Sequence, residues 1–334
     1  MRMLLPILLA LSAAGPPSET PKPLPSIAVF DQQAAGGEGA SVQGVVQGLT
    51  EAGYRVEVIR DLDPLSLAPH DILYLSDMHR PGTVDAGWRQ HIESYVRAGG
   101  SVLQTWHHHL LPQVAYGVQR VYASRRMYVV PGHPAVAGLS DFQAIHRDHI
   151  VEKVGPAGTP LLKNEAGQVV AAAGMLEKGK VISTGLALAI PDGNQSAPPR
   201  GAEQDLLMAF LRWLKPTVPP AERIRALVRE PILAVSPRAA LVAAGTEAAF
   251  LVRVGVPRGE ATTVRCGAAR VTPAREPQQL EGGVVVHTYR VAFPTHATTG
   301  AVHEHPIQAQ VGERTLEYTA RVESVSATPP PNER

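Results

Sequence analysis

The stretch YVRAGGSVLQTWHHH, residues 95–109, sets the expectation for the fold of this chain. It reads as a helix end, a Gly-Gly turn, a short apolar strand, and then Trp106 followed by His107–His109. In an open sheet of alternating strands and helices, ligands bind in the crevice beyond the carboxyl ends of the strands. We therefore expect the residues after this strand to border a ligand site. Several α/β enzymes hold a Cys or Ser nucleophile there, and this chain has neither.

Strands and helices alternate around this stretch. Apolar runs predict strands at 27–30, 54–59, 71–76 and 101–105, and apolar residues at helical spacing predict helices at 41–52 and 85–97. Such alternation favours right-handed crossovers and a mostly parallel sheet. Shorter strands follow from about residue 127 and predict an antiparallel extension of the sheet, which a helix at 203–214 closes.

The character of the sequence changes near residue 229. Alternating β-rich segments then recur, separated by turn residues, at 248–256, 284–293, 307–311 and 315–322. About ninety residues of such strands fit an immunoglobulin-like sandwich, in architecture only, because the antibody-type cysteines are absent. We expect an α/β domain at 26–216, a linker at 217–228, a sandwich at 229–324 and a disordered tail at 325–334.

The N-terminus has the layout of a secretory signal. Arg2 supplies a positive charge, Leu4–Leu11 form a short apolar run, and Ser12–Ala14 are small residues suited to cleavage. We predict a signal peptide at 1–14, a proline-rich linker at 15–25, and export to the periplasm or beyond. The apolar run is too short to cross a bilayer, and the sequence predicts no transmembrane segment.

Charge and cysteine content narrow the classes of partner. The formal net charge is +1, which gives no reason to expect nucleic acid or an anionic membrane. Cys266 is the single cysteine, so neither an intramolecular disulfide nor a thiolate metal cluster can form. Its alternating surroundings predict a small buried hydrophobe.

Several segments together resemble a known family. They are DILYLSDMH (71–79), DAGWRQHIESYVRAGGSVLQTW (85–106), GHPAVAGLSDFQAIH (132–146), LEKGKVISTGLAL (176–188) and AFLRWL (209–214). In order and spacing the region from 26 to 215 resembles the ThuA-like (trehalose-utilisation) family of the class I glutamine-amidotransferase-like superfamily. The resemblance implies a flavodoxin-like α/β domain in front of the immunoglobulin-like sandwich.

The site positions of that family are changed here. Where amidotransferases place a catalytic Cys, this chain has Trp106 and His107, so the resemblance does not carry glutamine amidotransferase activity. The histidine typical of ThuA-like proteins corresponds to Trp106 in a strict alignment, or to His107 after a one-residue slip. After the Asp-Phe motif, ThuA-like proteins usually have an acidic pair, and this chain has HRDH at 146–149. After the Gly-Lys-Val strand they often have Gly-His, and this chain has Ala187-Leu188.

Histidines near the predicted strand ends suggest a divalent metal site. Imidazole and carboxylate groups that converge in a cleft can hold Zn²⁺ or a similar ion, and the candidate ligands are His107, His109, Asp148 and His149. Their spacing matches no compact metal motif. The alternative is a set of polar histidines that line a loop-rich crevice without metal.

A polar ligand is the other candidate occupant of the crevice. Candidate ligand-binding residues follow the first, third and fourth predicted strands: Asp31, Gln32, Asp77, His79, Trp106, His107 and His108. The Trp106 ring suits stacking on a sugar, and it equally suits burial in the core. The segment at 31–40 also reads as a surface turn, and Asp77 with Arg80 as a surface ion pair.

Three functional hypotheses remain open from the sequence. The first is an exported ligand-binding or accessory module, for carbohydrate. The second is a metal-dependent hydrolase or sugar-modifying enzyme that uses the histidine cluster. The third is a structural envelope protein whose sandwich docks a protein partner.

Overall fold

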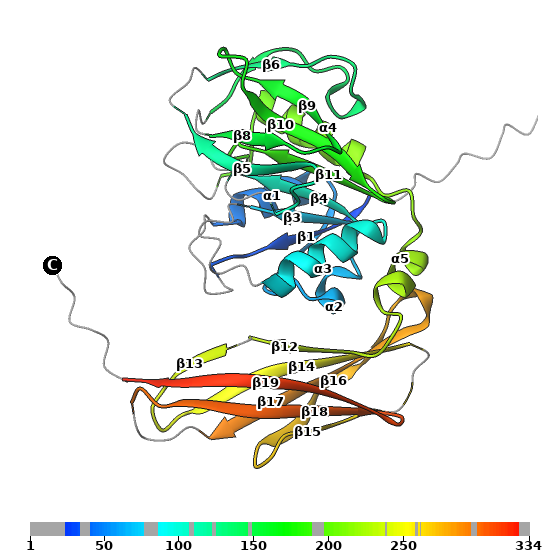
Figure 1. Cartoon of the computed structure of the whole chain (residues 1–334), viewed down its shortest axis with the longest axis vertical. Coiled ribbons are helices and arrows are strands. Elements are labelled where there is room, and N and C mark those ends of the chain that lie inside the picture. Colours follow the sequence, from blue (N-terminus) through cyan, green and yellow to red (C-terminus); the bar gives the residue numbers. More distant parts are fainter. Residues whose placement is uncertain are drawn as a thin grey trace, which may run out of the picture.

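A computed structural model describes residues 24–33, 41–76, 86–106, 110–121, 125–145, 149–188, 197–237, 239–257, 260, 262–294 and 299–326. The expected signal peptide at 1–14 lies outside the described residues, as do most of the expected linker at 15–25 and most of the tail. The chain forms a sheet with flanking helices and, below it in Figure 1, a β-sandwich.

A nine-stranded mixed sheet organises the first part of the chain, in the order β2-β1-β3-β4-β11-β10-β9-β6-β7. Its parallel half consists of β2 (Arg55–Ile59), β1 (Ser26–Phe30), β3 (Ile72–Leu75), β4 (Ser101–Thr105) and β11 (Gly179–Thr184). Its antiparallel half adds β10 (Val169–Leu176), β9 (Gly158–Lys163), β6 (Arg126–Val129) and β7 (Phe142–Gln143). A separate pair, β5 (Ala115–Arg120) and β8 (His149–Val154), is antiparallel.

Helices cover both faces of this sheet, which explains its continuous apolar strands. β1, β3 and β4 are buried along their whole length. On one face, α1 (Gln43–Glu51) and α4 (Ala202–Leu214) pack Leu49, Leu207 and Phe210 into a core, beside the short helix η2 (Pro134–Val136). On the other face, α2 (Pro64–Leu67) and α3 (Ala86–Arg97) pack residues that include Ile92 and Val96.

Two four-stranded sheets form the sandwich. One has the order β12 (Ile232–Ser236), β14 (Glu247–Pro257), β17 (Val284–Pro294) and β16 (Arg270–Gln279), and the other β13 (Ala239–Ala243), β19 (Arg314–Val325), β18 (Val302–Val311) and β15 (Thr262–Arg265). A short helix, η3 (Glu281–Gly283), precedes β17. Alternate residues of β14 face the core, where the rings of Phe250 and Phe293 meet edge to face at 5.7 Å.

The expected flavodoxin-like, glutamine-amidotransferase-like α/β class is wrong. Of the described residues, 48% lie in strands, which form four sheets, and 20% lie in helices. The alternation of strand and helix that favoured the α/β class ends at β4. Between β4 and β11 the chain runs through six consecutive strands that pair antiparallel, and the sandwich adds eight strands that also pair antiparallel apart from the parallel pair β13–β19. The alternation of strands and helices over 27–105 covers only the first four strands. Most of the later strands pair antiparallel, so the α/β class does not extend to the whole chain.

A short helix joins the two parts. The segment 217–228, expected as a linker, contains α5 (Pro220–Leu227). Apolar residues from α2, α5, β12 and β17 form one buried cluster there, which includes Leu65, Ile224, Ala234 and Val286. The outward face of the sandwich, together with α5, therefore packs on the first part of the chain at α2 (Figure 1).

None of the helices formed by the described residues is both long and apolar enough to cross a membrane.

Candidate functional site

Trp106 follows β4 directly and has an unusual backbone conformation. Its φ is +63°, in the left-handed region that large side chains rarely adopt. The backbone N–H of Trp106 donates to the carbonyl of Thr184 at the end of β11, at 2.8 Å. Strained backbone of this kind persists only where the surroundings hold it, and it concentrates at functional sites.

The indole of Trp106 is held by His149. Its Nε1–H donates to Nδ1 of His149 at 2.8 Å, and the two rings meet edge to face with centroids 6.0 Å apart. His149 begins β8 and is 7% exposed, whereas Trp106 is half-buried and packs on Ala187. Because Nδ1 accepts this bond, the neutral imidazole carries its proton on Nε2. The aromatic group at the strand end is therefore fixed in orientation.

Buried polar groups support the same edge of the sheet. Gln104 of β4 donates from Nε2 to Oγ of Ser183 at 2.8 Å, and its Oε1 accepts the N–H of Leu110 at 2.6 Å. Gly185 follows β11 so closely beside β8 that an added Cβ would lie 2.2 Å from the carbonyl oxygen of His149. These contacts tie the ends of β4, β8 and β11 together.

A tyrosine and a glutamate extend this polar edge. The hydroxyl of Tyr74 donates to the carbonyl of Leu188 at 3.1 Å, and burial raises the pKa of this phenol above its ordinary value. Glu203, in the first turn of α4, accepts the N–H of Ile145 at 2.6 Å. Sequence reasoning missed both residues, because each lies inside an element whose apolar spacing reads as core.

The candidate ligand-binding residues are only partly described. Asp31 and Gln32 follow β1; Asp31 is half-buried, and Gln32 is 3% exposed. Trp106, a candidate for ligand binding, contacts His149, which the sequence suggests as a metal ligand. The remaining candidates lie outside the described residues: Asp77, His79, His107, His108, His109 and Asp148.

The metal hypothesis rests on the undescribed residues. Within the described ranges, no group of three or more His, Cys, Asp or Glu side chains is placed to hold an ion. Nδ1 of His149 accepts the indole N–H of Trp106 and so is not available to a metal in this arrangement. Cys266 is buried, and burial raises the pKa of its thiol to about 11, so it is no thiolate ligand at neutral pH.

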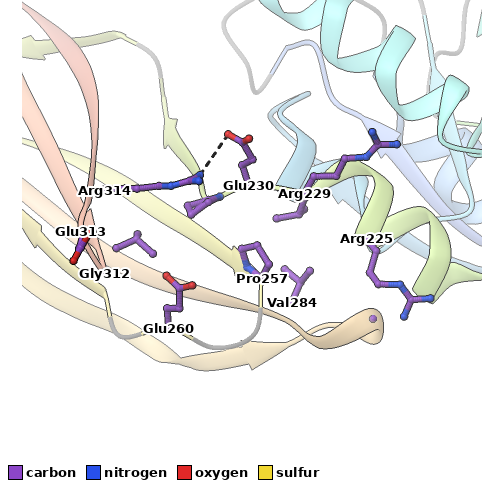
Figure 2. A pocket seen from close by; sticks show the side chains of 13 residues that line it. Arg225, Arg229, Glu230, Pro257, Glu260, Val284, Gly312, Glu313 and Arg314 are labelled. Atoms are coloured by element: carbon purple, nitrogen blue, oxygen red, sulfur yellow. Dashed lines mark ion pairs between the residues drawn. The ribbon is translucent and has the colours of Figure 1, made fainter.

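A cavity of about 840 Å³ lies far along the chain from this site, between α5 and the end of the sandwich (Figure 2). Its rim carries charges of both signs, including Arg225 and Arg229 on one side and Glu260 and Glu313 on the other. The Arg314–Glu230 pair spans 3.5 Å in an exposed setting, where such pairs contribute little to stability. Among the described residues, no aromatic side chain lines this cavity.

No protein-family profile matches the chain, and no curated protein matches it significantly. Among solved structures, an exo-β-1,4-mannosidase from an Opitutaceae bacterium is 12% identical over 59% of this chain and 37% of its own, with a TM-score of 0.38. The BIgI domain of the S. agalactiae beta protein, bound to CEACAM1, is 13% identical over 30% of this chain and its whole length, with a TM-score of 0.23. Human titin ZIg10 is 14% identical over 31% of this chain and 84% of its own, with a TM-score of 0.21. Similarities this low say nothing of activity or ligand.

Proposed function

We propose that the chain is a binding module that holds a polar, carbohydrate-like ligand at the carboxyl edge of β1, β4 and β11. Trp106 would form its aromatic wall. The observation that carries this proposal is the left-handed backbone of Trp106 together with the bond from its indole to His149.

A fixed, half-buried indole suits sugar recognition. With its N–H bonded to His149, the ring cannot turn to follow a ligand, so little side-chain entropy is lost when a sugar ring stacks on it. Asp31, half-buried at the end of β1, could accept hydrogen bonds from ligand hydroxyl groups. The resemblance to the ThuA-like family suggests that the ligand is a carbohydrate. The family resemblance and export of the protein both stay predictions.

If the protein is an enzyme, its catalytic residues are not Trp106 and Asp31. The position after β4 carries an indole and no nucleophile, so acyl transfer through a strand-end Ser or Cys is unsupported. A metal-dependent hydrolase would have to use the candidate ligands His107, His109, Asp148 and His149, and the indole bond to His149 Nδ1 would have to break or that ring would have to change tautomer. Docking of a protein partner through the sandwich likewise remains a prediction.

A glycan array followed by calorimetry tests the proposal. We expect one class of neutral or acidic glycan to bind, Trp106→Ala to weaken it roughly tenfold or more, and Trp106→Phe to weaken it less, because a ring is kept. Trp213→Phe, on α4 and packed against His133, is the matched control and should leave binding unchanged. A silent array, or glycan binding that Trp106→Ala leaves intact, contradicts the proposal. Stoichiometric zinc in the purified protein would favour the enzyme instead.

A further inference from the structure

Two buried ion pairs connect the sandwich and α5 to the first part of the chain. Arg223 of α5 is fully buried and donates from Nη2 to Oδ1 of Asp71 at 2.8 Å. Arg253 of β14 pairs with Asp63, which also caps α2. Helix α5 packs closely on η3 of the sandwich: a Cβ on Gly282 would lie 2.6 Å from a carbonyl of α5. Helix α5 therefore belongs to the sandwich side of the junction.

A buried histidine lies beside the first of these pairs. His70 is 5% exposed, and its Nε2 is 3.6 Å from Oε2 of Glu57. The charged groups that face it are Glu57 and Arg55 of β2, the adjacent Asp71, and Arg223 of α5. The hydroxyl of Tyr95, on α3, donates to its carbonyl. Among the described residues, Nδ1 of His70 has no hydrogen-bond partner.

A second histidine lies beside the other pair. His91 of α3 lines a cavity of about 230 Å³ between α2 and α3 on one side and β12 on the other. The ionisable side chains around it are Asp61, Asp63 with its partner Arg253, and Tyr318. Its Nδ1 is buried and finds no hydrogen-bond partner in the described part of the chain.

We propose that this junction is an acid-sensitive latch, which holds the sandwich docked at neutral pH and releases it when His70 and His91 take up protons. The sheet with its helices and the sandwich can each stay folded after they separate. Among the described residues, the two faces of the nine-stranded sheet and the interior of the sandwich have separate apolar cores, and the contacts between the two sides come from the smaller junction cluster and from Leu227 of α5.

The direction of the pH effect follows from burial. Burial lowers the pKa of His70 below the ordinary 6.5; Glu57 opposes this and Arg223 adds to it. Burial likewise lowers the pKa of His91, against the opposing Asp63 carboxylate. Undocking would remove the Arg223 guanidinium from beside His70 and β12 from beside His91, so the undocked form would bind more protons. This contribution to docking is complete above pH 6.5 and is lost as the pH falls through the lowered values.

The Asp71 carboxylate titrates in a lower pH range than the histidines. Burial raises the pKa of Asp71, but the Ser26 N–H and the Arg223 guanidinium outweigh it, so the pKa lies below the ordinary 3.8. The Asp71 carboxylate therefore keeps its charge in the range where the histidines titrate. Release near pH 5 would therefore report on the histidines and not on neutralisation of Asp71.

Spin-label distances across the junction test the latch in the full chain. With Cys266→Ser as background, Gln90→Cys on α3 and Thr319→Cys on β19 provide exposed labelling sites on the two sides. We expect a narrow distance distribution at about pH 7.5, and a longer, broader one at about pH 5, with unchanged far-UV circular dichroism. An unchanged distribution at both values overturns the proposal.

Histidine variants separate the latch from general acid sensitivity. His70→Gln with His91→Gln should move the midpoint of release downward by about one pH unit, because the titrating groups are gone. His287→Gln is the matched control: burial lowers the pKa of His287 too, but it lines a cavity in the sandwich away from the junction. A double variant that releases at the wild-type pH overturns the proposal. If it does not fold, the wild-type titration with the control still decides.

Discussion

Arg223→Met should destabilise the protein more than any single change on its surface. The guanidinium is fully buried, and in the described structure its Nη2–Asp71 bond is the one hydrogen bond that holds it, since Nε and Nη1 have no partner there. Methionine fills a similar volume without charge. The substitution leaves Asp71 without its counter-ion in a partly buried position.

The expected magnitude follows from what Asp71 retains. Removing one partner of a buried ion pair costs about 3–5 kcal/mol. Asp71 is 20% exposed and keeps hydrogen bonds from the backbone N–H and the hydroxyl of Ser26, at 2.8 and 3.0 Å. Both features favour the lower end, about 3 kcal/mol, which corresponds to roughly 5 °C in Tm for a chain of this size.

Thermal and urea unfolding at neutral pH, followed by circular dichroism, measure this effect. Arg270→Ala is the matched control, because Arg270 and Glu247 form an exposed pair on the sandwich, and its loss should cost less than about 1 kcal/mol. Adding Asp71→Asn to Arg223→Met should cost less than the sum of the two single changes. The reasoning is refuted if Arg223→Met is no more destabilising than Arg270→Ala.

Four further outcomes follow from single contacts. Gly185→Ala should cost about 1–3 kcal/mol, because its Cβ meets the His149 carbonyl at 2.2 Å; a Tm within a degree of wild type would argue against that close approach. Trp106→Phe removes the donor to His149 Nδ1 and should cost about 1 kcal/mol in urea unfolding, and no measurable loss would mean that the bond is replaced by water. Tyr95→Phe removes the buried bond to the His70 carbonyl and should lower Tm by a few degrees, whereas an unchanged Tm would show that bond to be dispensable. Because burial raises the pKa of Cys266 to about 11, its thiol should react slowly with a disulfide reagent at pH 8 and fast in urea; rapid labelling of the native protein would contradict the burial.

The local elements around the site could be predicted from sequence, because each depends on neighbours along the chain. The predicted strands at 27–30, 71–76 and 101–105 coincide closely with β1, β3 and β4. The Gly-Gly turn is also local in origin: a Cβ on Gly100 would lie 2.3 Å from the Tyr95 ring, five residues earlier. Placing Trp106 at a strand end followed from these elements.

The partners of Trp106 could not be predicted in the same way. His149 is 43 residues away, and its contact depends on β8 lying beside β11. The sequence suggested a metal ligand at His149, which stays a prediction; the structure shows that its Nδ1 accepts the N–H of the Trp106 indole. The class of the fold was misjudged for a related reason: alternation along 27–105 says nothing of how the later strands pair.

By itself the sequence determined where strands and helices begin and end near the site, since apolar periodicity and glycine turns act over a few residues. Only the tertiary structure decided how the two parts of the chain are joined. Arg223 pairs with Asp71, which lies 152 residues earlier in the chain, and Arg253 pairs with Asp63, which lies 190 residues earlier. No local pattern selects such partners, because their pairing energy arises only after two separately folded cores have come together and excluded water.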